Sequence, residues 1–127
     1  MPTASRSPKR WVRAIEIKPD FTEAHSNLGA AHKETGDLTR AIESYKRAIQ
    51  INSDFTEAHN NLGNALKELG DLAGAIESCN RAIEINPDYA EGHYNLANVL
   101  KDGGDLTSAI ESYQRAIEIK ADYADAH

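Results

Sequence analysis

The sequence predicts an all-α array of stacked helix pairs, and three observations lead to this prediction. A 34-residue block at 21–54 recurs at 55–88 and at 89–122 with most of its residues unchanged. Within each block, apolar residues recur at spacings of three and four, the period of one helical face. A Gly-Asp pair in the middle of each block can end one helix and cap the next. Repetition at this period is typical of proteins whose units bury their apolar faces against their neighbours.

The first half of each block predicts a helix, near 22–35 in the first copy. Ala24, Leu28 and Ala31 lie at i, i+4 and i+7, so we expect them to form one buried stripe. Gly36 supplies a left-handed residue at the end of this helix, and Asp37 is placed to cap the following one.

The second half predicts another helix, near 38–52 in the first copy. Its apolar stripe contains two small residues, Ala41 and Ala48, which allow antiparallel helices to approach closely. One position of this helix, repeated every 34 residues, holds the large aromatic residues Trp11, Tyr45 and Tyr113, which we call the aromatic column and expect to fill the space between the helices. Cys79 stands at the same position of the second unit and interrupts this column. At the junction with the next block, Asp54 precedes Glu57 by three residues, the spacing of a capping box.

The repetition divides the chain into six segments. They are a basic disordered tail at 1–10, a partial second helix of a leading unit at 11–20, complete units at 21–54, 55–88 and 89–122, and the start of a fourth unit at 123–127. The last complete unit should expose the apolar stripe of its second helix to water, because no full unit follows it. We therefore expect either a piece of a longer array or self-association through exposed ends.

Composition excludes several classes of partner. The net charge of −6 and the pI near 5.3 argue against nucleic acid, because lysines interleaved with acids make no basic stripe. No stretch approaches the roughly 20 apolar residues of a membrane span. The single cysteine fits a reducing compartment. The default expectation is a soluble, cytoplasmic protein that needs no cofactor.

The 34-residue unit closely resembles the tetratricopeptide repeat. The resemblance rests on N-L-G at 27–29 and 61–63, G-D in the middle of each block, R-A-I near its end and P-D at the junction. It implies a right-handed superhelical solenoid of antiparallel helix pairs. The sequence pattern E-A-H-x-N-L-G, followed by A-I-E-S-Y and R-A-I-E-I, is most similar to the repeat arrays that precede O-linked N-acetylglucosamine transferases and their bacterial relatives.

The resemblance also implies a protein or peptide partner, held in a concave groove that the first helices of the units line. Helical spacing predicts which residues face that groove, because they lie opposite the Ala24, Leu28 and Ala31 stripe. The predicted site comprises Glu23, Ser26, Asn27, Lys33, Glu57, Asn60, Asn61, Asn64, Lys67, Glu91, Tyr94, Asn95, Asn98 and Lys101.

The asparagines of this set are the leading candidates for gripping an extended peptide. Asn27, Asn61 and Asn95 repeat at the same position, and a side-chain amide carries both a donor and an acceptor for peptide groups. Hydrogen bonding between helices is an equally weighted alternative role for them. Tyr94 is a candidate anchor for a ligand, with an ordinary surface tyrosine as the alternative.

Other functions fit the sequence less well. Family members that hold the acidic tails of heat-shock chaperones use Lys or Arg where this chain has Glu23, Ser26 and Asn27. The histidines repeat every 34 residues, so they should lie about 10 Å apart, whereas a zinc ligand lies about 2 Å from its metal. We expect no metal site, and no catalytic constellation is present. The sequence therefore predicts a binding protein that is not an enzyme; the alternatives are a self-associating scaffold and the recognition arm of a larger glycosyltransferase.

Overall fold

A computed structural model describes residues 21–126, so the predicted tail at 1–10 and the partial helix at 11–20 lie outside it. Within the described range the regular elements are helices and no strand occurs. The first helix covers 21–34. It is followed by α2 (Leu38–Ile51), α3 (Thr56–Leu69), α4 (Leu72–Ile85), α5 (Ala90–Asp102) and α6 (Leu106–Ala126). We call 21–34, α3 and α5 the A helices, and α2, α4 and α6 the B helices.

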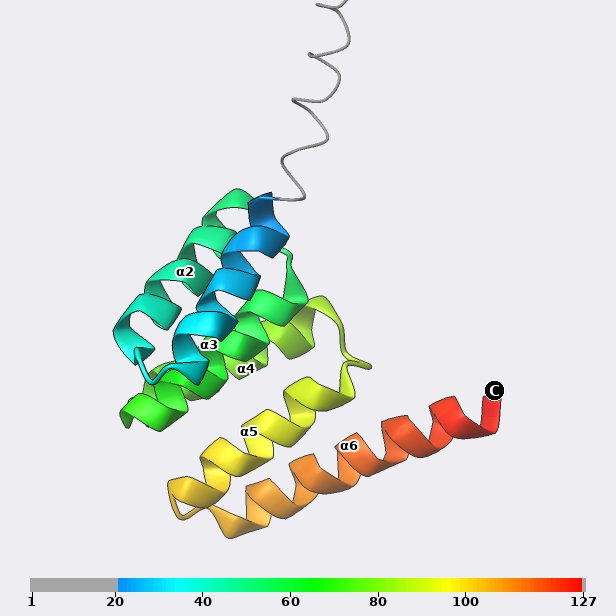
Figure 1. Cartoon of the computed structure of the whole chain (residues 1–127). Coiled ribbons are helices and arrows are strands. Elements are labelled where there is room, and N and C mark those ends of the chain that lie inside the picture. The colour runs from blue at the N-terminus through cyan, green and yellow to red at the C-terminus, as the bar shows by residue number, and fades with distance from the viewer. Residues whose placement is uncertain (1–20, 127) are drawn as a thin grey trace, which may run out of the picture.

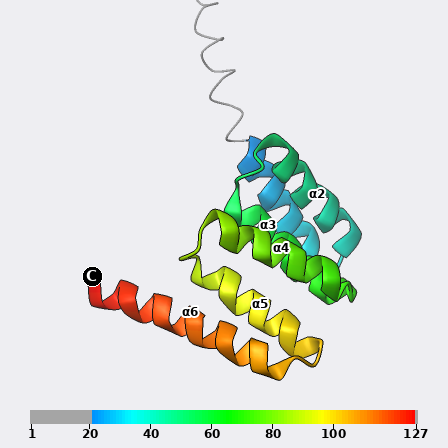
Figure 2. The same cartoon turned by 180° about the vertical axis from the view of Figure 1, so that it is seen from behind.

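The helices form a stack in which each unit contacts its neighbour (Figure 1). Within units, α3 packs on α4 and α5 packs on α6. Between units, α2 packs on α3, α4 packs on α5, and the A helices α3 and α5 also touch. Seen from behind, α6 is the outer layer at one end of the stack and extends past α5 (Figure 2). Apolar burial is therefore divided among the interfaces, as expected of a repeat array.

The turn between the A and B helices of each unit has the predicted form. Gly70 has a φ of 99°, a left-handed conformation that costs glycine little. An Asp71 carboxylate oxygen then accepts the backbone N–H of Gly74 at 2.9 Å and caps α4. The first and third units repeat this arrangement with Asp37 and Asp105.

The predicted capping box between units is wrong. The N-cap residues of α3 and α5 are Phe55 and Tyr89, and neither makes a side-chain cap. Instead the Asn52 amide oxygen accepts the N–H of Asp54 at 3.1 Å, and Asn86 does the same for Asp88 at 3.2 Å. With this asparagine turn, the N-cap position of α3 and of α5 lies one residue past the aspartate.

The predicted start of a fourth unit at 123–127 is not a new helix over the residues described. Residues 123–126 extend α6, which runs unbroken from Leu106 to Ala126. The third unit has Lys120 and Ala121 where the second has Asn86 and Pro87. Lysine and alanine favour helix, whereas asparagine forms the turn and proline stops the helix.

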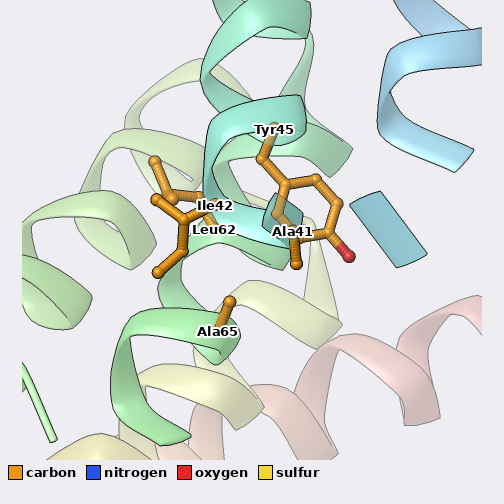
Figure 3. Packing of buried hydrophobic residues seen from close by; sticks show 5 residues of the cluster. All are labelled: Ala41, Ile42, Tyr45, Leu62 and Ala65. Atoms are coloured by element: carbon orange, nitrogen blue, oxygen red, sulfur yellow. The ribbon is translucent and has the colours of Figure 1, made fainter. Parts of the chain in front are cut away.

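A buried cluster joins the first and second units (Figure 3). It contains Ala41, Ile42 and Tyr45 from α2, and Leu62 and Ala65 from α3. Tyr45 is only 1% exposed. A Cβ atom at Gly29 would lie 2.6 Å from the Tyr45 ring, so only glycine allows the ring to fit under the first helix.

A second buried cluster joins the second and third units, with smaller side chains on the B helix. Ala75 and Cys79 of α4 pack against Val99 of α5, and all three are fully buried. Gly63 touches this cluster too, because a Cβ atom there would lie 2.7 Å from the Cys79 sulfur. Cys79 therefore interrupts the aromatic column as predicted, and Val99 occupies the neighbouring space.

The two ends of the stack expose residues that are buried inside it. The stripe predicted from Ala24, Leu28 and Ala31 is exposed in the first helix, where Leu28 is 47% exposed; the equivalent Leu62 is 7% exposed. The difference arises because α2 covers Leu62, while no described helix covers Leu28. At the other end, Ile110 and Ile117 of α6 are largely exposed, as predicted for the last B helix.

Candidate functional site

A polar strip runs along one face of each A helix. On α3 it consists of Glu57, Asn61, Asn64 and Glu68, spaced by four, three and four residues. The corresponding residues are Glu91, Asn95, Asn98 and Asp102 on α5, and Glu23, Asn27, Ala30 and Glu34 on the first helix. The glutamates are exposed, Asn27 is exposed, and the other asparagines are half-buried. We use the name polar strip for these three sets together.

Two asparagines of α5 are held by hydrogen bonds at one end of their side-chain amide. Asn95 Nδ2 donates to Asn60 Oδ1 of α3 at 3.0 Å. The Tyr113 hydroxyl of α6 donates to Asn98 Oδ1. These bonds leave the Asn95 oxygen as an acceptor and the Asn98 NH2 group as a donor. Hydrogen bonding between helices, the alternative role for this column, is therefore present at Asn95.

Two residues of the predicted site do not have exposed side chains. Ser26 is 2% exposed and Asn60 is 5% exposed. Asn60 is covered because it faces the A helix of the next unit, where Asn95 meets it. Helical spacing predicted that Ser26 and Asn60 face the open groove. They are buried because each A helix packs against the helices of two units, and the second contact covers their side of the helix.

Tyr94 belongs to the same column as Ser26 and Asn60, and its position differs from the one predicted. It is 53% exposed, but it lies on the side that a following A helix covers in the earlier units. Its ring packs edge-on against Tyr113 at 5.9 Å between ring centroids. Tyr94 therefore belongs to the end of the stack and not to the polar strip.

The lysines of the predicted site form a ladder of ion pairs between units. Lys33 Nζ lies 3.0 Å from Glu68 Oε2, and Lys67 Nζ lies 3.7 Å from Asp102 Oδ2. Each lysine thus meets an acid of the next A helix, not its own neighbour in sequence. Among the described residues, Lys101 has no acid in that position.

Tyrosine hydroxyl groups lie near the acids of the polar strip. Burial raises the pKa of Tyr45 above its ordinary value, and the charges of Glu57 and Glu68 add to the rise. Burial also raises the pKa of Tyr89, followed by the charge of Glu91 and a hydrogen bond with it, while a hydrogen bond with Asn60 acts the other way. Neutral phenols are thus the favoured state beside these carboxylates.

The repeated histidines serve the junctions between units. His59 Nε2 lies 2.9 Å from the Ser53 carbonyl oxygen, and His93 Nε2 lies 2.9 Å from that of Pro87. Each imidazole can donate to the backbone of the turn that precedes its own helix. Over the residues described, no group of three potential metal ligands comes together.

Sequence reasoning missed two residues that shape the site. Tyr113 orients Asn98, and Tyr89 lies beside Asn60 and Glu91. From the sequence, Tyr113 was assigned only to the aromatic packing column, and Tyr89 was given no role in the site. Tyr89 carried a usable signal, because it replaces the phenylalanine of the first two units with a side chain that can hydrogen-bond.

A pocket on the other side of the stack offers an alternative surface. It has a volume of about 1100 Å³ and lies between α2, α3 and α4. Lys46 and Gln50 line one wall, and Glu77 and Arg81 line the other. Arg81 is engaged by Glu84 at 3.2 Å, so its charge is partly neutralised.

None of the described helices combines the length and the apolar character needed to cross a bilayer. A sequence comparison with curated proteins found no match. Among solved structures, MamA is 25% identical with a TM-score of 0.76, over 82% of this chain and 61% of that one. A Thermobaculum terrenum O-GlcNAc transferase mutant is 30% identical with a TM-score of 0.78, over 84% of this chain and 20% of that one.

A third similar structure is the first TPR of Spaghetti (RPAP3) bound to the HSP90 peptide SRMEEVD. It is 20% identical with a TM-score of 0.77, over 80% of this chain and 81% of that one. These likenesses concern a helical solenoid, in agreement with the predicted fold class. The family model described as TPR repeat matches residues 32–70, 63–102 and 97–127. Since those matches together extend from 32 to 127, the chain belongs to the TPR repeat family.

Proposed function

We propose that this protein is an interaction module that binds an extended peptide segment along the polar strip of its A helices. The observation that carries this proposal is the pair of oriented amides on α5. Asn95 is held through its NH2 group and Asn98 through its oxygen. The oxygen of Asn95 therefore remains as an acceptor and the NH2 group of Asn98 as a donor, three residues apart on a single helical face.

Such a pair suits the backbone of an extended chain, which offers N–H and C=O groups at every residue. Holding the amides in place before binding reduces the entropy that a ligand must overcome. Asn61 and Asn27 continue the row on the preceding A helices. A row of this kind grips main chain, so it tolerates many ligand sequences.

The charges of the strip favour a basic segment over an acidic one. Lys33 and Lys67 are engaged by acids of the next unit, whereas Glu57 and Glu91 remain exposed. The Spaghetti structure contains an acidic peptide, SRMEEVD. We infer a different ligand here, because Lys33 and Lys67 are already paired with acids of the next unit, which leaves Lys101 as the one lysine of the predicted site without such a pair among the described residues.

A binding assay with labelled dodecapeptides of basic, neutral and acidic composition tests the proposal. We expect affinity to fall in that order. The triple variant Asn27→Ala, Asn61→Ala, Asn98→Ala should lose at least about tenfold in affinity, since several amide contacts of about 0.5–1.5 kcal/mol each disappear. Its helicity, followed by circular dichroism, should match that of the wild type.

The matched control is the triple variant Gln50→Ala, Asn80→Ala, Gln114→Ala. It also removes three exposed amides, but from the B helices, and two of them line the pocket on the other side of the stack. We expect it to bind as the wild type does. Loss of binding in this control, with the strip variant unaffected, would move the site to that pocket.

The likeness to the O-GlcNAc transferase favours a second candidate role. The chain spans 20% of that protein and is 30% identical to it. We therefore also propose that the array serves as the substrate-recognition arm of a larger glycosyltransferase. Sequencing the gene past the codon for residue 127 tests this role, because a transferase domain must follow in the same reading frame.

A further inference from the structure

We propose that the ligand of the polar strip is a polyproline II segment that carries a basic residue at every third position. This inference rests on the proposed function, because it concerns the ligand of the same surface. It adds two properties that binding along the strip does not require, namely a backbone conformation and a spacing of charged side chains. Both properties follow from the alignment of neighbouring A helices.

The helices α3 and α5 lie side by side, and contacts join them near their first turns and at their middle. Burial raises the pKa of Tyr89, and the charges of Glu91 and Glu57 add to the rise, so this phenol lies near the first turn of both helices. At the middle, Asn95 Nδ2 donates to Asn60 Oδ1 at 3.0 Å. The two helices therefore run alongside each other and do not cross at a single point.

The ion pairs near the ends of the A helices show that the alignment is regular. The Lys67 and Asp102 pair of α3 and α5 joins residues 35 positions apart, and so does the Lys33 and Glu68 pair of the first helix and α3. The asparagine contact between α3 and α5 has the same separation of 35. A constant separation means that successive A helices keep one register. Packed helices lie about 8–10 Å apart, so equivalent residues should repeat at that distance.

The polar strip therefore offers the same groups at each step of about 8–10 Å across the stack. Asn61 and Asn95 are equivalent residues of α3 and α5, and both are half-buried. Glu57 and Glu91 are likewise equivalent, and both are exposed. A peptide that crosses the A helices meets an amide and a carboxylate at every step. Its own groups must return to the same side at the same distance.

Polyproline II is the backbone conformation with this period. It completes one turn in three residues with a rise of 3.1 Å per residue, so every third residue returns to the same face after about 9.3 Å. A β-strand covers a similar distance in three residues, but its side chains alternate, so the third residue faces away. An α-helix uses its N–H and C=O groups internally and leaves none for the amides of the strip.

The exposed glutamates set the charge of every third residue. Glu91 precedes Asn95 by four residues, roughly 6 Å along the helix axis. A ligand residue whose N–H meets the Asn95 oxygen can extend a long basic side chain over that distance to Glu91. The equivalent residues of α3 repeat the arrangement for the ligand residue three positions away. The two residues in between need not donate, so proline is tolerated there.

Three labelled dodecapeptides with equal numbers of arginines test the inference by fluorescence anisotropy. The first peptide has arginine at every third position and proline elsewhere. The second has the same composition, but its arginines stand at alternate positions. The third keeps the arginines of the first and has threonine in place of every proline, which favours a strand. The second peptide thus tests the spacing, and the third tests the conformation.

We expect the first peptide to bind most tightly. The second should bind about three- to tenfold more weakly, because its arginines cannot meet successive glutamates together. The third should bind at least about threefold more weakly, because a chain that is not preorganised loses more entropy on binding.

A pair of variants tests whether the glutamates of the strip recognise the spacing. Glu57→Gln with Glu91→Gln should abolish the preference for the first peptide over the second while helicity is unchanged. The matched control is Glu77→Gln with Glu111→Gln, which removes two exposed charges at equivalent positions of α4 and α6. The control should keep the preference of the wild type.

Four results would overturn the inference. If the first and second peptides bind equally, the spacing is wrong; if the third binds as tightly as the first, the conformation is wrong. In both cases binding itself would leave the proposed function standing. Equal loss of the preference in the strip variant and in its control would separate the spacing from the strip. Failure of all three peptides to bind would overturn the proposed function as well.

Discussion

The interface between the first and second units and the interface between the second and third fill the same space differently. At the first, the buried cluster combines the large Tyr45 of the B helix with the small Ala65 of the next A helix. At the second, the cluster combines the small Cys79 with the larger Val99. At each interface a large side chain on one helix is combined with a small side chain on the other. The size of the residue at a given position of the repeat therefore differs from unit to unit. A single unit therefore cannot be understood without the unit that covers it.

The polar parts of the two interfaces differ as well. At the second interface, Asn95 donates a hydrogen bond to Asn60, and Tyr89 lies nearby. The equivalent positions at the first are Ser26, Asn61 and Phe55. The second interface thus adds directional contacts where the first relies on an aromatic core. Directional contacts fix how two units align, whereas apolar contacts mainly supply stability.

Truncating the equivalent B-helix residue at each interface should give the largest contrast. We expect Tyr45→Ala to lower the free energy of unfolding by about 3–5 kcal/mol, as for other buried aromatic residues. Cys79→Ala should cost only about 1 kcal/mol, because it removes a single buried atom. Urea unfolding followed by circular dichroism measures both. Equal losses would show that the tyrosine ring contributes no more than the thiol.

Changing the size balance at the second interface should give the next largest effect. Cys79→Tyr should lower the free energy of unfolding by about 1–3 kcal/mol, because Gly63 and Val99 leave no room for a ring. Adding Val99→Ala should recover part of this loss, since it recreates the Tyr45 and Ala65 arrangement. A double-mutant cycle measures the coupling, expected at about 0.5–3 kcal/mol. Strict additivity would contradict the compensation between the two residues.

The second interface should also be the more sensitive to alkaline pH. Burial raises the pKa of the Cys79 thiol from 9.0 to about 11. The folded state therefore holds this proton more tightly than the unfolded state. The resulting stability is complete below pH 9.0 and is lost as the pH rises through about 11.

Urea unfolding of wild type and Cys79→Ala at pH 8 and pH 10.5 measures this effect. We expect the wild type to lose more stability than the variant between the two conditions. Burial raises the pKa of Tyr89 as well, so Tyr89→Phe should reduce the alkaline loss further. Parallel losses in wild type and Cys79→Ala would mean that the thiol does not contribute.

The lysine ladder should show the smallest difference between the interfaces. The Lys33 and Glu68 pair spans 3.0 Å and the Lys67 and Asp102 pair spans 3.7 Å. Both are partly exposed, so a double-mutant cycle should give each about 0.2–1 kcal/mol. The first pair should have the larger coupling, and high salt should reduce both. A larger coupling for the longer pair would contradict this order.

Much of the fold could be read from the 34-residue repetition, because helical period and turn chemistry are local. The Gly-Asp turns, the alternation of A and B helices and the exposed stripe of α6 were all predicted from residues close in sequence. The junctions were less predictable. Both Asn52 and Asp54 can accept a backbone N–H at this junction, and the structure uses Asn52. Which of the two accepts depends on the backbone conformation of the turn, and the spacing of residues in the sequence does not give that conformation.

The candidate site could be predicted only in part. Helical spacing located Asn95 and Asn98 on one face, but it also placed Ser26, Asn60 and Tyr94 there. Those three lie where an A helix meets the next unit. Periodicity identifies faces of an isolated helix, and it cannot tell how wide a sector each neighbour will cover.

The sequence by itself determined the family of this chain, its helices and the columns of repeated residues, since these follow from local propensity and from a fixed period. The tertiary structure decided which columns are open to a partner. It showed that Lys33 and Lys67 pair with the next unit, that Tyr113 orients Asn98, and that Val99 lies in the same buried cluster as Cys79. Those facts depend on contacts between residues 15 to 35 positions apart, and only the packing of whole helices sets such distances.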